Sequence, residues 1–164
     1  MIRKMSPSDV PQVAALAQQK REQYQDYQPQ FWRVADNAVG LHTPFVEHMV
    51  NDDSFVAFVA TEGDEITGFV TGRLVPSPPV YNPGGPAAYI DDFHVASPDL
   101  WATTGRDLLR VVTEQLASRG AAQVVVVCGH RDQAKRAALS ASGLSLATEW
   151  YVGSTGSREG TSLR

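Results

Sequence analysis

The chain has 164 residues, of which 43% are hydrophobic and 20% charged, and its formal net charge is −4. These values are typical of a globular protein, and we expect one domain over residues 1–152 followed by a polar tail over 153–164. No apolar run reaches membrane-spanning length and no secretory pattern is evident, so we expect a cytoplasmic protein that does not bind membranes. The single cysteine, Cys128, fits a reducing compartment.

The charges are unevenly distributed along the chain. Residues 1–100 have 6 basic and 13 acidic side chains, a net charge of −7, whereas residues 101–136 have 6 basic and 3 acidic ones, a net charge of +3. A mostly acidic chain argues against nucleic acid as the main partner. The basic sector suits a polyanionic cofactor, with a cationic acceptor approaching elsewhere, although a random mosaic of solvated charges would give the same pattern.

Hydrophobic periodicity and turn residues predict ten elements in the order β-α-α-β-β-β-α-β-α-β. In chain order they are a strand over Ile2–Met5, a helix that starts at a capping box over Ser6–Asp9 and ends between Gln18 and Gln23, a short helix from Thr43, strands over Phe55–Thr61, Ile66–Val75 and Ala88–Val95, a helix that stops at Gly120, a buried strand over Ala121–Cys128, a helix over Arg131–Ser142 and a strand over Leu144–Val152.

Two segments between these elements have no regular pattern. Residues 24–40 are expected to form a loop, in which Phe31 and Trp32 act as lid or core anchors rather than as a binding box. Residues 76–86 are too rich in proline and glycine to be regular.

The stretch over residues 87–120 is the most informative part of the chain. Aromatic and β-branched residues over 88–95 predict a strand, which Pro98 ends. The hydroxyls of Thr103 and Thr104 can cap a helix whose leucines and valines recur at helical spacing. A loop that delivers free backbone N–H groups to a helix N-terminus is suited to binding an anion.

The strand within this stretch breaks its own alternation. Phe93 and Val95 share one face, yet the apolar Ile90 has the opposite parity. A bulge at Asp91–Asp92 would bring all three to one side and splay the strand. A strand buried on both faces is the alternative, because it needs no strict alternation.

The segment YIDDFHVASPDLWATTGRDLL, residues 89–109, resembles the acetyl-CoA signature of the GNAT superfamily of N-acetyltransferases. In that signature a strand ending in Val and a following Pro lead to an Arg/Gln-x-x-Gly-x-Gly/Ala loop and a Leu-Leu helix. The residues in register with it are Val95, Pro98, Gly105, Leu108 and Leu109. Leu100 replaces the Arg or Gln and Thr103 replaces the first Gly, so the pyrophosphate loop is degenerate.

The resemblance covers about residues 1–152 and implies an α/β fold. Its central sheet would be mixed, mostly antiparallel and splayed at the fourth strand, with helices on both faces. It also implies acetyl-CoA as the cosubstrate. The residues it assigns to acetyl-CoA binding are Phe93, Val95, Leu100, Trp101, Ala102, Thr103, Thr104, Gly105 and Arg106, together with Asp132, which stands where the family has an Asn.

One family feature is missing. In many members a Tyr protonates the departing thiolate, and Leu139 stands at its position, where it cannot act as an acid. Tyr81 and Tyr151 are the substitutes that sequence position allows.

The candidates for the base are Asp92, then His94, with Asp91 as a third residue near the expected acetyl carbonyl. The alternative is that the two aspartates solvate an irregular backbone and that His94 is structural. The four histidines, His42, His48, His94 and His130, lack metal-ligand spacing, so no metal is expected.

The sequence therefore predicts an acetyl-CoA-dependent N-acetyltransferase acting on a primary amine of a small molecule or peptide. The alternative is a degenerate GNAT fold that binds CoA, or another ligand, without catalysis. An exposed last strand would allow a homodimer.

Overall fold

The computed structural model describes residues 1–156. Its elements, in chain order, are β1 (Ile2–Lys4), η1 (Pro7–Asp9), α1 (Val10–Tyr27), α2 (Ala38–Asn51), β2 (Phe55–Glu62), β3 (Glu65–Val75), β4 (Ala87–Val95), η2 (Pro98–Ala102), α3 (Thr104–Ser118), β5 (Gln123–Val126) and α4 (Gln133–Ala141). None of the described helices is long and apolar enough to cross a membrane.

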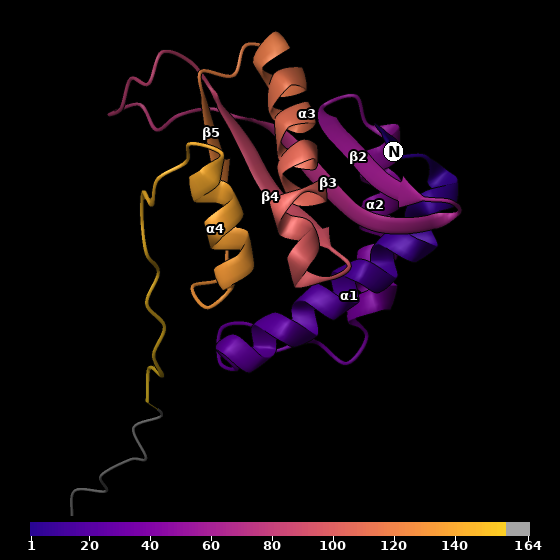
Figure 1. Cartoon of the computed structure of the whole chain (residues 1–164). Coiled ribbons are helices and arrows are strands. Elements are labelled where there is room, and N and C mark those ends of the chain that lie inside the picture. The colour runs from indigo at the N-terminus through magenta and orange to yellow at the C-terminus, as the bar shows by residue number, and fades with distance from the viewer. Residues whose placement is uncertain (157–164) are drawn as a thin grey trace, which may run out of the picture.

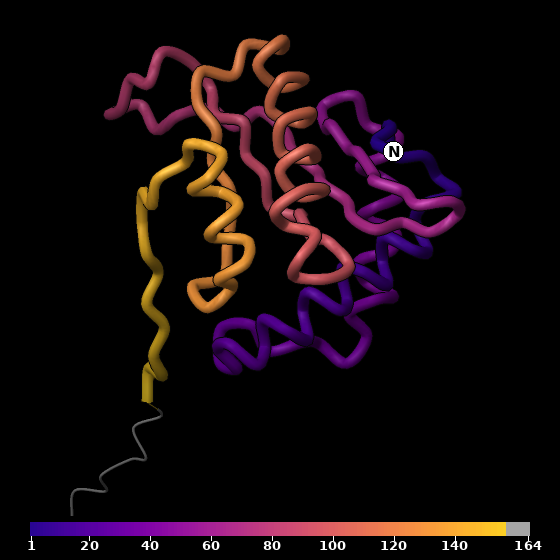
Figure 2. Tube along the Cα trace, in the orientation of Figure 1, coloured from indigo at the N-terminus to yellow at the C-terminus, as the bar shows by residue number. Residues whose placement is uncertain are grey.

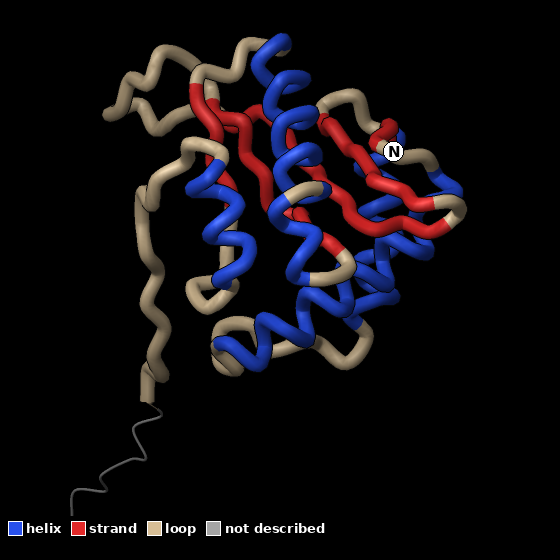
Figure 3. Tube along the Cα trace, viewed as in Figure 1, coloured by secondary structure: helices blue, strands red, loops and turns tan. Residues whose placement is uncertain are grey.

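The strands form one five-stranded sheet in the order β1-β2-β3-β4-β5 (Figure 3). The first three pairs are antiparallel, and β4 and β5 run parallel. The turn between β2 and β3 passes through Gly63, whose φ of 59° lies in the left-handed region that favours glycine. The mixed, mostly antiparallel sheet confirms the predicted fold class.

Helices cover both faces of this sheet (Figure 1). On one face, α3 and α4 enclose a buried cluster that contains Ile90, Phe93, Val95, Leu108, Val112, Leu116 and Ala138. On the other face, α1 and α2 enclose a second cluster that contains Val10, Val13, Ala17, Val46, Met49, Val59 and Phe69. Burial of these apolar stripes is the main force that holds the helices on the sheet.

Two glycines in β3 let α3 approach the sheet closely. A Cβ atom at Gly68 would lie 3.0 Å from Leu108 Cδ1, and one at Gly72 would lie 2.9 Å from Leu116 Cδ1. The leucines of α3 occupy this space instead, so the helix sits directly over β3, with β2 and β4 on either side. The position of α3 in turn fixes where its N-terminus lies beside the end of β4.

The predicted helices of the N-terminal half are too short. α1 continues to Tyr27 because Lys20 and Tyr24, which follow Ala17 at helical spacing, are buried against β4 and the segment before α4. α2 begins at Ala38 rather than at Thr43, and Pro44 lies inside it. Burial of Val46 and Met49 holds this helix in spite of the hydrogen bond that Pro44 removes.

The C-terminal half departs further from the prediction. β5 has only four residues and Val125 is 39% exposed, so it is a half-covered edge strand and not a buried one. The expected strand over Leu144–Val152 is absent, and Trp150 and Tyr151 are exposed. Figure 2 shows this segment leaving the body of the protein after α4. A strand needs a hydrogen-bonded neighbour, which its own sequence does not supply. Of the predicted tail, residues 157–164 lie outside the described residues.

Candidate active site

The bulge predicted in β4 is present. Val70 of β3 pairs with Phe93 and Gly72 pairs with Ile90, so one β3 residue, Thr71, faces both Asp91 and Asp92. The extra residue reverses the parity of the strand, and Ile90 therefore lies in the same buried cluster as Phe93. The same bulge turns Asp91 and Asp92 toward the α1 and α2 side of the sheet, where they line a cavity.

The sheet opens directly after the bulge. β4 and β5 are paired from Ala87 to Ile90, and the last link is the N–H of Val127, which donates to Ile90 O at 3.0 Å. From Asp91 to Val95, β4 has no partner in β5. Two backbone carbonyls in this unpaired stretch of β4 accept hydrogen bonds from lysine side chains. Lys20 Nζ donates to Asp91 O and Lys135 Nζ donates to Phe93 O, each at 3.1 Å.

A buried polar cluster fills the opening. The hydroxyl of Tyr24 donates to Asp132 Oδ2 at 3.0 Å and accepts from the N–H of Gly129 at 3.1 Å. Asp132 also caps α4, because its Oδ1 accepts from the N–H of Lys135 at 3.2 Å. The cluster thus joins the end of α1 to the start of α4 across the splayed strands.

Lys135 is the most unusual member of this cluster. It is fully buried, with Nζ 5.0 Å from the ring centre of Phe93 and 5.3 Å from that of Trp101. Burial and the nearby charge of Lys20 lower the pKa of Lys135 to about 7. Its ammonium form makes one hydrogen bond and no ion pair within residues 1–156, so folding disfavours the protonated form of this amine.

A first cavity of about 500 Å³ lies at the open end of β4. Its lining comes from the end of the strand and η2 (His94, Val95, Ala96, Ser97, Pro98 and Trp101), from the start of α4 (Arg131, Asp132, Gln133 and Ala134) and from α1 (Gln19, Gln23 and Tyr27). Burial, with the charges of Lys20 and Lys135, lowers the pKa of His94 to about 4, so this imidazole is neutral at pH 7. Its Nδ1 is buried and has no hydrogen-bond partner among the described residues.

The loop-to-helix segment beside this cavity keeps its backbone donors available. Thr103 is the N-cap residue of α3, but contrary to the prediction its side chain makes no capping hydrogen bond. The first-turn N–H groups, from Thr104 to Arg106, lack intrahelical acceptors as at any helix start. Gly105 is required here, because a Cβ atom would lie 2.5 Å from Trp101 Cε3. Thr103 adopts no left-handed backbone, so it replaces a glycine without strain of that kind.

A second cavity of about 520 Å³ lies on the other side of α1. Its lining includes Lys20 and Arg21 of α1, Phe31, Trp32 and Arg33 of the following loop, His42 and Phe45 of α2, and both aspartates of the bulge. Asp92 is paired there with two bases, since Oδ2 lies 2.9 Å from His42 Nε2 and Oδ1 lies 3.4 Å from Lys20 Nζ. Burial alone would raise the pKa of Asp92, but these partners hold it well below its usual range.

The structure brings the sequence candidates to one place but not into one cavity. Asp91 and Asp92 line the second cavity, whereas His94 and Val95 line the first. Of the predicted loop residues, Leu100 and Trp101 pack into the core, and Ala102, Thr103 and Arg106 are exposed. Phe93 is buried, and its carbonyl faces the opening between the strands.

Sequence reasoning missed Lys20, Tyr24, His42 and Lys135. A signal was present for the first two, because Val13, Ala17, Lys20 and Tyr24 recur at helical spacing and place a lysine on an apolar stripe. Lys135 likewise lies three residues before the buried Ala138. A lysine on the buried face of a helix predicts a buried amine.

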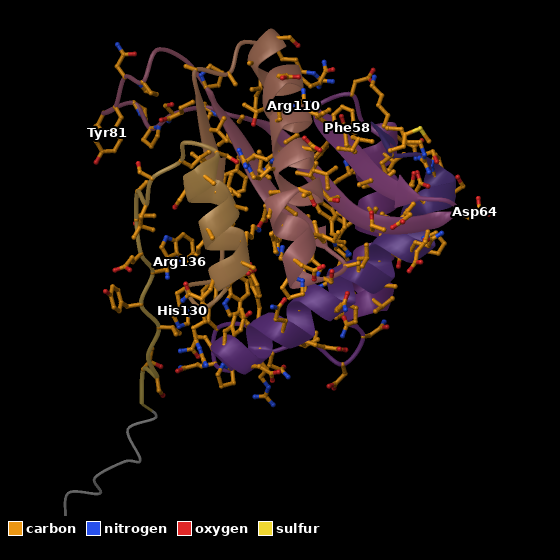
Figure 4. The ribbon with its side chains drawn as sticks, in the orientation of Figure 1. Phe58, Asp64, Tyr81, Arg110, His130 and Arg136 are labelled. Carbon is orange, nitrogen blue, oxygen red and sulfur yellow. The ribbon has the colours of Figure 1, made fainter. Side chains whose placement is uncertain are left out.

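The two tyrosines considered as proton donors are exposed and line neither cavity. Tyr81 and Tyr151 are 71% and 91% exposed. Figure 4 shows Tyr81 in the projecting loop, near one end of β4 and β5, with His130 near the other end. Leu139 packs against the core and offers no donor.

No family model matches the sequence, and no curated protein matches it. Solved structures do match. A predicted acetyltransferase of Clostridium acetobutylicum, solved with acetyl-CoA, is 15% identical over 94% of this chain and 95% of that one, with a TM-score of 0.72. A GCN5-related N-acetyltransferase of Ralstonia eutropha is 16% identical over 95% and 99%, with a TM-score of 0.68.

An aminoglycoside 6'-N-acetyltransferase of Acinetobacter haemolyticus is 8% identical over 95% of this chain and 98% of that one, with a TM-score of 0.71. At identities of 8 to 16%, these similarities show a shared fold.

Proposed function

We propose that this chain, whose fold is that of the GNAT acetyltransferases, transfers an acetyl group from acetyl-CoA to a primary amine of a small molecule. The proposal rests above all on the divergence of β4 and β5 after Ile90, beside a cavity of about 500 Å³. A similar structure solved with acetyl-CoA supports the cosubstrate, and the aminoglycoside enzyme supports a small-molecule acceptor.

The residues around the first cavity fit this cosubstrate. The uncapped first turn of α3 offers backbone donors and a helix dipole to a pyrophosphate. Arg106 and Arg131 add positive charge near it, and the unpaired edge of β4 from Asp91 to Val95 offers backbone groups to the pantetheine amides. The side chain of Asp132 is already engaged by Tyr24 and by the N–H of Lys135, so we assign it to positioning α4.

When bound, acetyl-CoA would supply an activated acetyl group, whose transfer forms a C–N bond, breaks the C–S bond and requires a proton for the sulfur. We assign that proton to Nζ of Lys135. This amine reaches the β4 backbone from α4, one helical turn before Leu139, where the resemblance places the missing acid. A pKa of about 7 lets the group hold or release a proton near neutral pH.

The proton of the acceptor amine needs a second group. We assign it to His94, which is neutral at pH 7 and lines the first cavity beside the bulge. Asp92 is a poorer acceptor, because its two basic partners hold its pKa well below the usual range. Its role is then to hold Lys20 and His42, and Asp91 remains free to attract an ammonium group.

The test combines direct titration with acetyl-CoA and a CoA-release assay over a panel of amines. Binding with turnover supports the proposal, and binding without turnover of any amine supports the alternative of a fold that binds CoA without catalysis. No binding at millimolar acetyl-CoA refutes the proposal and CoA binding alike. Arg106→Gln should weaken binding in a salt-dependent manner. Arg110→Gln is the matched control, because Arg110 lies one turn further along α3 and is already paired with Glu114 at 3.0 Å.

A further inference from the structure

The second cavity contains more positive charge than its carboxylates can match. Three cations, Lys20, Arg21 and Arg33, line it together with two carboxylates, Asp91 and Asp92. An acceptor cavity for a polycation would be expected to have the opposite balance, because like charges in a confined site repel.

One carboxylate of the cavity is already neutralised within the protein. Asp92 lies between Lys20 Nζ and His42 Nε2, at 3.4 and 2.9 Å. Lys20 is also bound to the carbonyl of Asp91. This pair can therefore do little to attract either end of a charged substrate.

The remaining charges are free. Arg21 is half-buried, and its one side-chain contact in the described part of the chain is Gln18 Oε1 at a marginal 3.5 Å. Burial lowers the pKa of Arg21, although the charge of Asp92 acts in the opposite direction, and no carboxylate lies within ion-pairing distance of Arg21 among residues 1–156. Arg33 and Asp91 form no ion pair among residues 1–156.

Two unpaired guanidinium groups and one unpaired carboxylate thus face one cavity of about 520 Å³. An anion with two oxygens suits the guanidinium groups, since these bind carboxylates in a bidentate manner. An ammonium group suits Asp91, which lies on the bulge of β4 next to the opening in the sheet. Phe31, Trp32 and Phe45 supply apolar surface to the same cavity.

We infer that the acceptor is an amino-carboxylate, meaning an amino acid or a short peptide whose amine and carboxylate are both held in this cavity. The inference rests on the proposed acetyltransferase function and narrows its acceptor. Arg21 and Arg33 bind the carboxylate, and Asp91 directs the amine toward β4. Polyamines and aminoglycosides are poor acceptors, because their additional ammonium groups meet the two arginines.

The test compares phenylalanine with phenylalaninamide in the CoA-release assay. The two molecules differ in the carboxylate, and the aromatic side chain suits the walls of the cavity. The amide has the more acidic ammonium group and thus more neutral amine at a given pH, so this difference works against the expected result. A charge-assisted contact with an arginine predicts a preference for the acid of about 10- to 100-fold in kcat/KM.

Arg21→Gln and Arg33→Gln should each reduce this preference, because each should lower kcat/KM for the acid more than kcat/KM for the amide. Arg73→Gln is a matched arginine control, because Arg73 stacks over Phe55 outside the cavity, and it should retain the full preference. Spermidine and kanamycin complete the panel as polycationic acceptors. They should be the poorest substrates of the set.

Equal rates for the acid and the amide, or a preference for spermidine or kanamycin, would overturn the inference while the acetyltransferase function stands. Failure of acetyl-CoA to bind would instead refute the function. In that case, or if no amine is turned over, calorimetry of the wild type with phenylalanine and with its amide decides the inference. Binding of the acid alone that Arg21→Gln abolishes supports it, and the absence of a difference overturns it.

Discussion

Replacing Lys135 by methionine should make the protein more stable and remove a dependence of stability on pH. The side chains have similar shape, so the replacement removes a buried amine without opening a cavity. The folded-state pKa is about 7 and the unfolded-state value is 10.5. Because the folded pKa is the lower one, the unfolded chain binds more protons, and the amine destabilises the fold most at low pH.

The magnitude follows from these two values. The penalty on folding is about 5 kcal/mol at pH 6, where the amine is protonated in both states. Above pH 7 it falls by about 1.4 kcal/mol for each pH unit, to about 2 kcal/mol at pH 9. The hydrogen bond to Phe93 O, worth about 1 kcal/mol, is lost in the variant and reduces the gain equally at each pH. Lys135→Met should therefore be more stable than the wild type at pH 6, and the difference should shrink as the pH rises.

Urea unfolding of both proteins at pH 6, 7, 8 and 9 measures this difference directly. Arg136→Met, an exposed neighbour on α4, is the control. It loses a hydrogen bond to His130 O at 2.7 Å, but its stability should change with pH as that of the wild type does. Parallel curves for Lys135→Met and the wild type over this range would refute the reasoning, since they would mean that the amine titrates alike in both states.

Three further predictions concern other parts of the molecule. Stability should fall by about 3 kcal/mol as the pH decreases from 6.5 to 4, where burial prevents His94 from being charged, and His94→Gln should remove that loss in urea unfolding. Gly105→Ala should lower the free energy of unfolding by about 1–3 kcal/mol, because its Cβ meets Trp101 at 2.5 Å. Thr103→Gly should leave acetyl-CoA affinity equal or better in calorimetry, because backbone groups and not this side chain would bind the phosphates.

The sequence allowed the bulge in β4 to be predicted because its signal is local. Ile90 breaks the alternation set by Phe93 and Val95, and only an extra residue between them restores one buried face. The strand, loop and helix that follow were predictable for the same reason. Each depends on neighbours within one helical turn or one strand.

The polar cluster could not be predicted in this way, because its members meet only in three dimensions. Tyr24 and Asp132 are 108 residues apart, and Lys135 is 42 residues from the carbonyl it binds. The prediction of a strand over Leu144–Val152 was wrong for a related reason. Apolar alternation indicates that a segment can pair, but the presence of a neighbour is a property of the whole sheet.

The cost of Lys135 bears on its role, because a buried amine with one hydrogen bond destabilises the fold at neutral pH and methionine would fit its place. If Nζ supplies a proton to the departing sulfur, the more stable Lys135→Met variant should lose about 10²–10⁴-fold in kcat and keep its affinity for acetyl-CoA. Its defect should shrink with an acetyl thioester of a more acidic thiol, which needs less protonation. Lys135 would hold no catalytic proton if the variant were as active as the wild type on acetyl-CoA and if the thioester of the more acidic thiol raised both rates by the same factor.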